Sequence, residues 1–213
     1  MIDKYKFVIW DWNGTVLDDV ELCHDLINWL LRSYNLNTIS LEEYKNVFTI
    51  PVKNYYEKVG FNFKEESFEI IGKKWMDEYE RRKYECGLFE GIENVFRKIQ
   101  SMNIRQSVLS AYSQHTLQAL IEYYKLTGYF SHIVGLDNIY AASKIAIGKN
   151  LIKKLGAKKG EAVMIGDTLH DYEVANEIGA DCILLSCGHQ SELKLKEGSG
   201  NKIKILPDAK SIL

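Results

Sequence analysis

Apolar residues along this chain follow two kinds of pattern, and the first is the unbroken run Phe7–Trp10. A run of β-branched and aromatic residues predicts a strand buried on both faces, as in a parallel sheet. Asp11 follows directly and would stand at the carboxyl end of that strand, where open α/β sheets bind ligands. The same residues also fit a strand that ends in an Asn-Gly turn with no further role.

Residues 17–85 show the second pattern, in which apolar positions recur at helical spacing. The expected helices cover the apolar stripe from Cys23 to Tyr34 and residues 41–48, 52–59 and 64–83. Asp18 or Asp19 would cap the first of these helices. The segment is too long for an ordinary connection between a strand and a helix. It predicts an all-helical cap subdomain, inserted over the ends of the strands.

From residue 86 onward the two patterns alternate. Strands are expected at 104–109, 131–134, 161–165, 181–185 and 203–205, and helices at 92–102, 114–125, 144–155 and 171–178. Alternation of this kind predicts right-handed βαβ units. Residues 1–16 and 86–213 would therefore form an α/β core, with a Rossmann-like parallel sheet and helices on both faces, and residues 17–85 the helical cap.

Composition narrows the class of protein. The 213 residues are 46% hydrophobic and carry a formal net charge of −2, so no electrostatic footprint for nucleic acid or a membrane surface is present. The four cysteines form no Cys-x-x-Cys pair, which is typical of reduced thiols in a cytoplasmic protein. We expect no nucleic-acid or membrane partners, and a monomer or homodimer.

Chemically active side chains follow several of the expected strands. They are Asp11, Asn13 and Thr15 after the first strand, Ser110 and Ala111 after the second, and Asp167 and Asp171 after the strand at 161–165. Lys144 stands at the start of a helix between them. Each alone has an ordinary explanation as a helix cap, a turn residue or a solvated charge. Because parallel strands end at one edge of the sheet, we expect these groups to converge there.

These motifs resemble those of the haloacid dehalogenase-like superfamily of phosphotransferases, in the type with a helical cap between the first and second motifs. Asp11–Thr15 is similar to the first motif, Ser110 to the second, and Gly166-Asp167 through Asp171 to the fourth. Lys144 matches the third motif, with Lys149 as an alternative. The resemblance covers nearly the whole chain. The type of cap further resembles that of phosphoglycolate phosphatases.

The resemblance implies a chemistry for each group. Asp11 would be the nucleophile that forms an aspartyl-phosphate. Mg²⁺, which prefers oxygen ligands, would be held by Asp11, the backbone carbonyl of Asn13, Asp167 and Asp171. The phosphoryl oxygens would be held by Thr15, Ser110, the backbone N–H of Ala111 and Lys144. The substrate would be a small phosphorylated metabolite.

Asn13 departs from the family pattern. Phosphatases of the family usually carry a second aspartate here, which protonates the leaving alkoxide and then activates water, whereas an amide cannot move a proton. One account is a slow or unusual hydrolase in which Asp18, His115 or His170 helps. A second is a protein that binds a phosphorylated ligand and has lost turnover, and a third is an introduced substitution.

The superfamily also contains dehalogenases and phosphonatases, which are alternatives to the phosphatase chemistry. The dehalogenases need no Mg²⁺, and the paired acids Asp167 and Asp171 argue against them. The phosphonatases replace the second aspartate by alanine and use a cap lysine for a Schiff base. Cap lysines that leave this alternative open are Lys45, Lys53 and Lys58.

The cap should select the substrate, because closure over the site excludes water. Thr49, Lys53 and Tyr55, with Tyr56, lie in the break between two cap helices and are expected to face the site. Packing tyrosines and a solvated lysine would explain the same residues equally well. His24, His115, His132 and His189 carry no assigned role.

Overall fold

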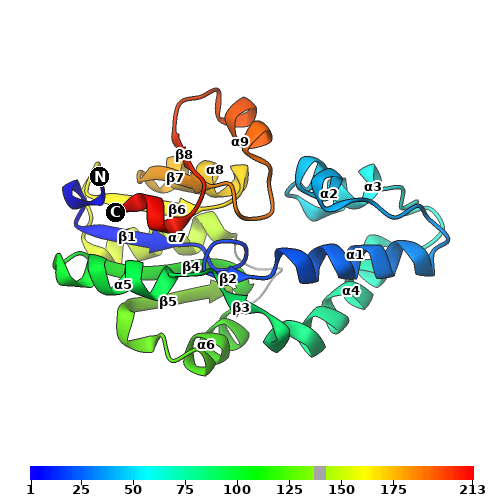
Figure 1. Ribbon diagram of the computed structural model, residues 1–213, viewed down its shortest axis with the longest axis horizontal. Coiled ribbons are helices and arrows are strands. Elements are labelled where there is room, and N and C mark those ends of the chain that lie inside the picture. Colours follow the sequence, from blue (N-terminus) through cyan, green and yellow to red (C-terminus); the bar gives the residue numbers. More distant parts are fainter. Residues whose placement is uncertain (137–142) are drawn as a thin grey trace.

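A computed structural model describes residues 1–136 and 143–213. Its centre is a six-stranded parallel sheet in the order β5-β4-β1-β6-β7-β8 (Figure 1). The strands are β1 (Phe7–Trp10), β4 (Arg105–Ser113), β5 (Phe130–Leu136), β6 (Ala162–Gly166), β7 (Asp181–Leu185) and β8 (Lys204–Leu206). From β1 the chain first adds β4 and β5 on one side and then β6, β7 and β8 on the other, so the strand order reverses at β1. In open α/β sheets, ligands bind in the crevice at such a reversal.

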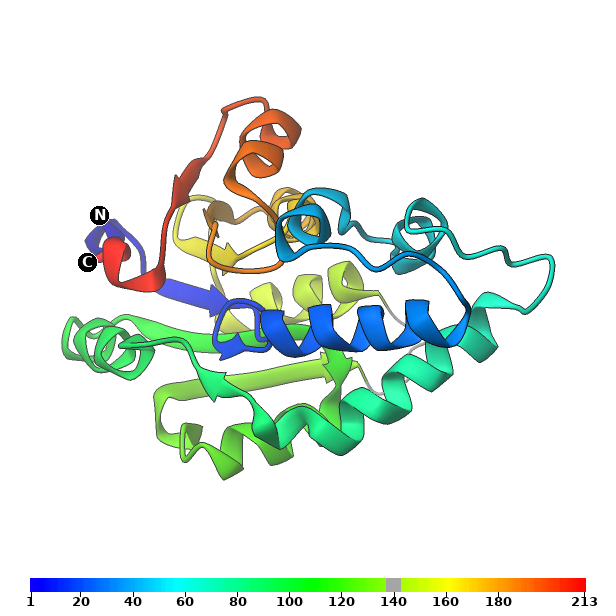
Figure 2. The same ribbon diagram turned by 45° about the vertical axis from the view of Figure 1, so that its right-hand side comes forward.

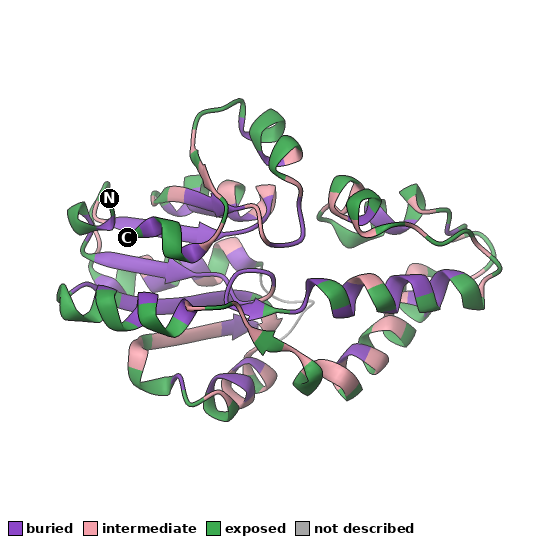
Figure 3. Cartoon of the chain, viewed as in Figure 1, coloured by how far each residue is buried: buried purple, intermediate pink, exposed green. Residues whose placement is uncertain are grey.

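Helices cover both faces of this sheet. They are α5 (Ile92–Ser101) and α6 (Gln114–Tyr123) on one face and α7 (Lys144–Leu155) and α8 (Leu169–Ile178) on the other, with α9 (Glu192–Ser199) near the β8 edge. Val8 and Trp10 pack with α5 and α6, whereas Phe7 and Ile9 pack with α7 and α8. Because alternate side chains of β1 point to opposite covered faces, every position of the strand is buried (Figure 3). The predicted α/β sheet is confirmed.

Four helices lie between two short strands that pair antiparallel, β2 (Leu17–Asp18) and β3 (Gly87–Leu88). The helices are α1 (Val20–Ser33), α2 (Leu41–Val47), α3 (Val52–Lys58) and α4 (Phe68–Arg82). We call residues 20–82 the helical insert. It has its own hydrophobic cluster, in which Leu26, Leu30 and Tyr79 are buried. Helices α1 and α4 run side by side and extend beyond the sheet (Figure 1, Figure 2).

Some element boundaries differ from the sequence expectation. Strand β4 continues to Ser113 instead of ending at residue 109, because it keeps pairing with β5 after a register shift. Helix α4 begins at Phe68 rather than residue 64, and Ser67 occupies its N-cap position. The β2–β3 ribbon and helix α9 were not anticipated. Among the described residues, no helix is both long and apolar enough to span a membrane.

Candidate active site

The carboxyl ends of the central strands bring three buried acids together. Asp11 follows β1 and is 8% exposed, while Asp167 follows β6 and Asp171 lies in the first turn of α8. Ligand oxygens of the three carboxyl groups lie within 4.8 Å of one another. The backbone N–H of Asp11 donates to the carbonyl of Ile165 at 2.8 Å, so β6 fixes where the first acid leaves its strand.

Lys144, the first residue of α7, is the cation of this cluster. Its Nζ lies 2.6 Å from Asp11 Oδ1 and 2.6 Å from Asp171 Oδ1, and all three side chains are shielded from solvent. Asp171 Oδ2 accepts hydrogen bonds from the backbone N–H of Asp167 and from both N–H and hydroxyl of Thr168. Burial alone would raise the pKa of Asp171, but Lys144 and these donors lower it below its ordinary value.

The pKa values of the other two acids, Asp11 and Asp167, are raised. Burial and the neighbouring Asp171 raise the pKa of Asp11 to about 6, against the opposing effect of Lys144. Burial, with the other two carboxylates, raises the pKa of Asp167 to about 7. One ammonium therefore does not balance three ionised carboxylates. These hard oxygen donors and this uncompensated charge fit a divalent cation of the Mg²⁺ type.

Asp167 is enclosed by backbone. Its Oδ2 accepts from the backbone N–H of His189 at 2.7 Å, and its Oδ1 accepts from the Thr15 hydroxyl at 3.0 Å. Gly14 has a φ of +69°, and a Cβ there would overlap the Asp167 carboxyl group. A Cβ at Gly188 would overlap the same group. Two glycines therefore allow two loops to close around this acid.

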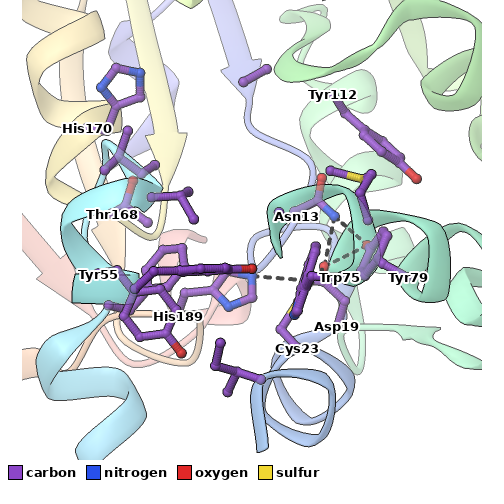
Figure 4. A pocket seen from close by; sticks show the side chains of 18 of the residues that line it. Asn13, Asp19, Cys23, Tyr55, Trp75, Tyr79, Tyr112, Thr168, His170 and His189 are labelled. Atoms are coloured by element: carbon purple, nitrogen blue, oxygen red, sulfur yellow. Dashed lines mark hydrogen bonds and ion pairs between the residues drawn. The ribbon is translucent and has the colours of Figure 1, made fainter. Parts of the chain in front are cut away.

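Asn13 belongs to a second polar cluster beside the acids. Its Nδ2 donates to Asp19 Oδ2 at 2.8 Å and to the Tyr79 hydroxyl at 2.7 Å, as Figure 4 shows. The Tyr79 hydroxyl donates to the same Asp19 oxygen at 2.7 Å, and the Gly14 N–H donates to Asp19 Oδ1. Asp19 occupies the N-cap position of α1 as expected, but its side chain makes no capping hydrogen bond, because these other partners take it instead. Asp18 makes none in its place, since it lies before the N-cap residue in strand β2.

His189 completes that cluster from the loop after β7. Its Nε2 lies 3.3 Å from Asp19 Oδ1 and its Nδ1 lies 2.8 Å from the Tyr44 hydroxyl. Burial disfavours the charged ring, but the carboxylates of Asp19 and Asp167 outweigh it and raise the pKa of His189 to about 9. His189 has no expected role from the sequence, because no local motif surrounds it.

A cavity of about 1140 Å³ lies between the strand ends and the helical insert. Of the expected site residues, seven in the core line it: Asp11, Asn13, Ser110, Ala111, Lys144, Asp167 and Asp171. Tyr55 lines it from α3, and His170 from α8. The structure therefore brings together the residues of all four motifs, with aromatic residues of the insert facing them.

Other expected site residues lie elsewhere. Thr15 does not line the cavity, because its buried hydroxyl faces Asp167. Thr49 and Lys53 do not line it either, and Lys53 Nζ lies over the ring of Phe63. Lys149, the alternative third-motif lysine, forms an ion pair with Glu177 on the protein surface.

The possible helpers and Schiff-base lysines are also mostly absent from the cavity wall. Neither Asp18 nor His115 lines the cavity. Lys45 donates to the backbone carbonyl of Cys187 at 2.9 Å, and Lys58 is an exposed residue at the end of α3. The insert lysines singled out for a phosphonatase reaction therefore do not face the acids.

The fold and the site define a Rossmann-like α/β protein, with acids and a lysine at its strand ends and a helical insert above them. The chain belongs to the haloacid dehalogenase-like hydrolase family, which matches residues 8–185. The resemblance inferred from the motifs is thereby confirmed.

Named relatives of the chain are phosphatases at low identity. A phosphoglycolate phosphatase from Pseudomonas savastanoi pv. phaseolicola is 20% identical over 98% of this chain and 78% of its own. The pyrophosphatase PpaX from Oceanobacillus iheyensis is 22% identical over 78% of this chain and 76% of its own. The crystal structure of a predicted phosphatase from Clostridium acetobutylicum shares the fold with a TM-score of 0.79, at 20% identity, covering 98% of this chain and 96% of that one.

Proposed function

We propose that the protein is a Mg²⁺-dependent phosphatase that hydrolyses phosphate monoesters with Asp11 as the nucleophile. The observation that carries this proposal is the buried cluster of Asp11, Asp167, Asp171 and Lys144 at the ends of parallel strands. The relatives support phosphoryl chemistry, since one is a phosphoglycolate phosphatase and another a pyrophosphatase.

The proposed reaction has two displacements. An oxygen of Asp11 bonds to phosphorus while the bond from phosphorus to the alcohol oxygen breaks, which gives an aspartyl-phosphate. Water then displaces Asp11 and releases inorganic phosphate. Lys144, held 2.6 Å from Asp11, would counter charge on the phosphoryl oxygens, together with Ser110 and the N–H of Ala111. Bound Mg²⁺, on Asp11, the Asn13 carbonyl, Asp167 and Asp171, would neutralise charge between nucleophile and phosphoryl group.

Asn13 limits both displacements. Its side-chain N–H groups already donate to Asp19 and Tyr79, and an amide has no proton to exchange with the leaving alkoxide. A positioned acid or base contributes roughly 10²–10⁴-fold, so turnover is expected to be slow by about that factor. The same observation favours a second candidate function, a protein that binds a phosphorylated ligand without turning it over.

Phosphate release separates the two candidates. The wild-type protein would be given a panel of phosphomonoesters with Mg²⁺ or with a chelator, beside Asp11→Asn. The matched control is Asp25→Asn, the same change at an exposed position of α1. Metal-dependent release that Asp11→Asn abolishes and Asp25→Asn keeps would support the phosphatase. If Mg²⁺ binds but no ester releases phosphate, the result would favour the second candidate, a protein that binds a phosphorylated ligand without turnover.

A further inference from the structure

The cavity wall above the acids is rich in aromatic residues. Eight aromatic residues line it: Tyr44, Phe48, Tyr55, Tyr56, Phe68, Trp75, Tyr79 and Tyr112. Exposed aliphatic residues of the insert, among them Ile50 and Met76, extend the same wall toward solvent. A volume of about 1140 Å³ is at the upper end for sites that enclose drug-sized ligands. The phosphoryl group of a substrate would fill only the part beside Asp11.

The aromatic side chains lie on both sides of this space. Tyr55 and His189 lie on one side and Trp75 and Tyr79 on the other, as Figure 4 shows. Trp75 stacks on Tyr79 with ring centroids 5.1 Å apart and planes 14° from parallel. Across from them, Tyr55 packs against Phe48 at 5.4 Å. Four of the eight, Phe48, Phe68, Trp75 and Tyr112, are only partly buried, so their rings present apolar surface that favours another aromatic group. The other four, Tyr44, Tyr55, Tyr56 and Tyr79, are 1–3% exposed and contribute little surface.

The charges on the wall do not favour a second anionic group. The described lining residues include six acids but only three lysines. Lys144 is held by Asp11 and Asp171, Lys73 by Asp77 at 2.6 Å, and Lys74 by Glu66 at 2.9 Å. The two lining histidines also face acids, His189 at Asp19 and His170 at Glu173. Each lysine of the described wall is thus already paired with an acid, so a carboxylate or second phosphate on the substrate would find no free lysine there.

We propose that the substrate is the phosphomonoester of a bulky alcohol that carries an aromatic ring, and not an ester of glycolate or a pyrophosphate. The inference rests on the proposed phosphatase function and specifies its substrate class. In the reaction the ester P–O bond breaks, water supplies the new phosphate oxygen, and the aromatic alcohol leaves with a proton from water. The aromatic wall then binds the part of the substrate that does not react.

Three esters of alcohols with similar acidity test this preference: 2-phenylethyl phosphate, n-propyl phosphate and 2-phosphoglycolate. Equal leaving groups remove intrinsic reactivity from the comparison. We expect kcat/KM to be about tenfold or more higher for 2-phenylethyl phosphate, mainly through a lower KM, because the phenyl group is buried in the wall. Equal or better use of n-propyl phosphate or 2-phosphoglycolate would overturn the inference and leave the phosphatase intact.

If no ester turns over, binding of unreactive phosphonates would test whether the cavity prefers an aromatic group. Titration calorimetry with Mg²⁺ present would compare 2-phenylethylphosphonate with n-propylphosphonate. Tighter binding of the phenyl compound by about tenfold, without turnover, would support the aromatic site in a protein that is not a phosphatase. Equal affinities, or binding of neither compound, would refute the aromatic site.

A pair of methionine variants links the preference to the wall. Met76 lines the cavity and is 43% exposed, whereas Met102 is 39% exposed and does not line it. Met76→Lys places a cation on the wall and should lower the ratio of kcat/KM for 2-phenylethyl phosphate over 2-phosphoglycolate by about tenfold. Met102→Lys should leave that ratio unchanged. An unchanged ratio in Met76→Lys would contradict the inference.

Discussion

By the resemblance of its first motif, Asn13 stands where phosphatases of this family usually carry a second aspartate, and its surroundings predict what introducing the acid would do. Asn13→Asp places a carboxyl group beside Asp19, where the amide now donates at 2.8 Å. Two acids this close cannot both ionise easily, so the introduced group should keep its proton near neutral pH and serve as a general acid. We expect kcat to rise by roughly 10²–10⁴-fold.

The measurement is kcat against pH for one ester, with Asn13→Ala as control. The alanine variant removes the same amide bonds but adds no proton, so its turnover should not increase. If Asn13→Asp is no faster than wild type, some other group performs the proton transfer or the protein does not turn over esters.

Tyr55 and Tyr79 both line the cavity but should respond differently to loss of the hydroxyl. The Tyr55 hydroxyl is buried and has no hydrogen-bond partner among the described residues, whereas that of Tyr79 donates to Asp19. A buried unpaired polar group costs about 1–3 kcal/mol, so Tyr55→Phe should raise the free energy of unfolding by up to that amount. Tyr79→Phe should lower it. Urea denaturation of both variants checks this, and destabilisation by Tyr55→Phe would contradict it.

At the scale of residues, sequence reasoning reached the groups that stand next to strands. Asp11, Ser110 and Asp167 could be predicted because buried strand residues precede each of them and parallel strands share one edge, although β4 continues past Ser110. His189 and Tyr79 could not, because they meet Asp19 only through packing of segments far apart in the chain. Sequence neighbours alone suggest that the Asp19 side chain caps α1, but in the structure it accepts hydrogen bonds from Asn13 and Tyr79 instead.

At the scale of elements, the loop after β1 depends on a glycine. Gly14→Ala puts a Cβ into the Asp167 carboxyl at a φ of +69°, whereas Gly156→Ala meets nothing within 4 Å at a φ of +64°. Both variants carry the strain of the left-handed region, about 1 kcal/mol or more, but only Gly14→Ala also displaces a candidate metal ligand.

Thermal unfolding and metal titration of the two variants would measure the difference. We expect Gly14→Ala to be the less stable of the pair and to bind Mg²⁺ more weakly than wild type, with Gly156→Ala unchanged in Mg²⁺ binding. Equal losses of stability with unchanged Mg²⁺ affinity would show that the loop has room to move.

Hydrophobic periodicity predicted the type of an element correctly where the whole element is buried in one uniform way. Strand β1 is covered on both faces and reads as a continuous apolar run, so its prediction was accurate. Strand β4 was predicted too short because its last residues, Ser110–Ser113, are not an apolar run and are held by pairing with β5. Helix α9 was not predicted because it has little apolar periodicity, although Ser191 at its start is a typical N-cap residue.

At the scale of the whole molecule, the buried acids link stability to pH and metal. Asp11 and Asp167 have pKa values of about 6 and 7, above the ordinary carboxyl value near 4. An acid whose pKa rises on folding stabilises the fold while protonated, so this contribution is lost as pH rises through about 6–7. Without metal, Tm should therefore fall between about pH 5 and pH 8. Mg²⁺ should raise Tm more at the higher pH, because it binds the ionised carboxylates.

Calorimetric scans with Mg²⁺ or chelator at both pH values would test this. In a chain of this size about 1 kcal/mol corresponds to roughly 2–4 °C in Tm. Asp167→Asn is the control: it should reduce both the fall of Tm with pH and the effect of Mg²⁺. If Mg²⁺ does not change Tm at either pH value, the result would argue against a metal site at these acids.

The ribbon of β2 and β3 has an evolutionary consequence. The chain leaves the sheet through Leu17–Asp18 and returns through Gly87–Leu88, and these two segments are hydrogen-bonded neighbours. A tight turn would suffice to join them, so replacement of the stretch between them by recombination would leave the register of the sheet's strands unchanged. Under the proposed function, preference for one alcohol over another would be exchanged with that stretch, while the phosphoryl chemistry would stay with the sheet.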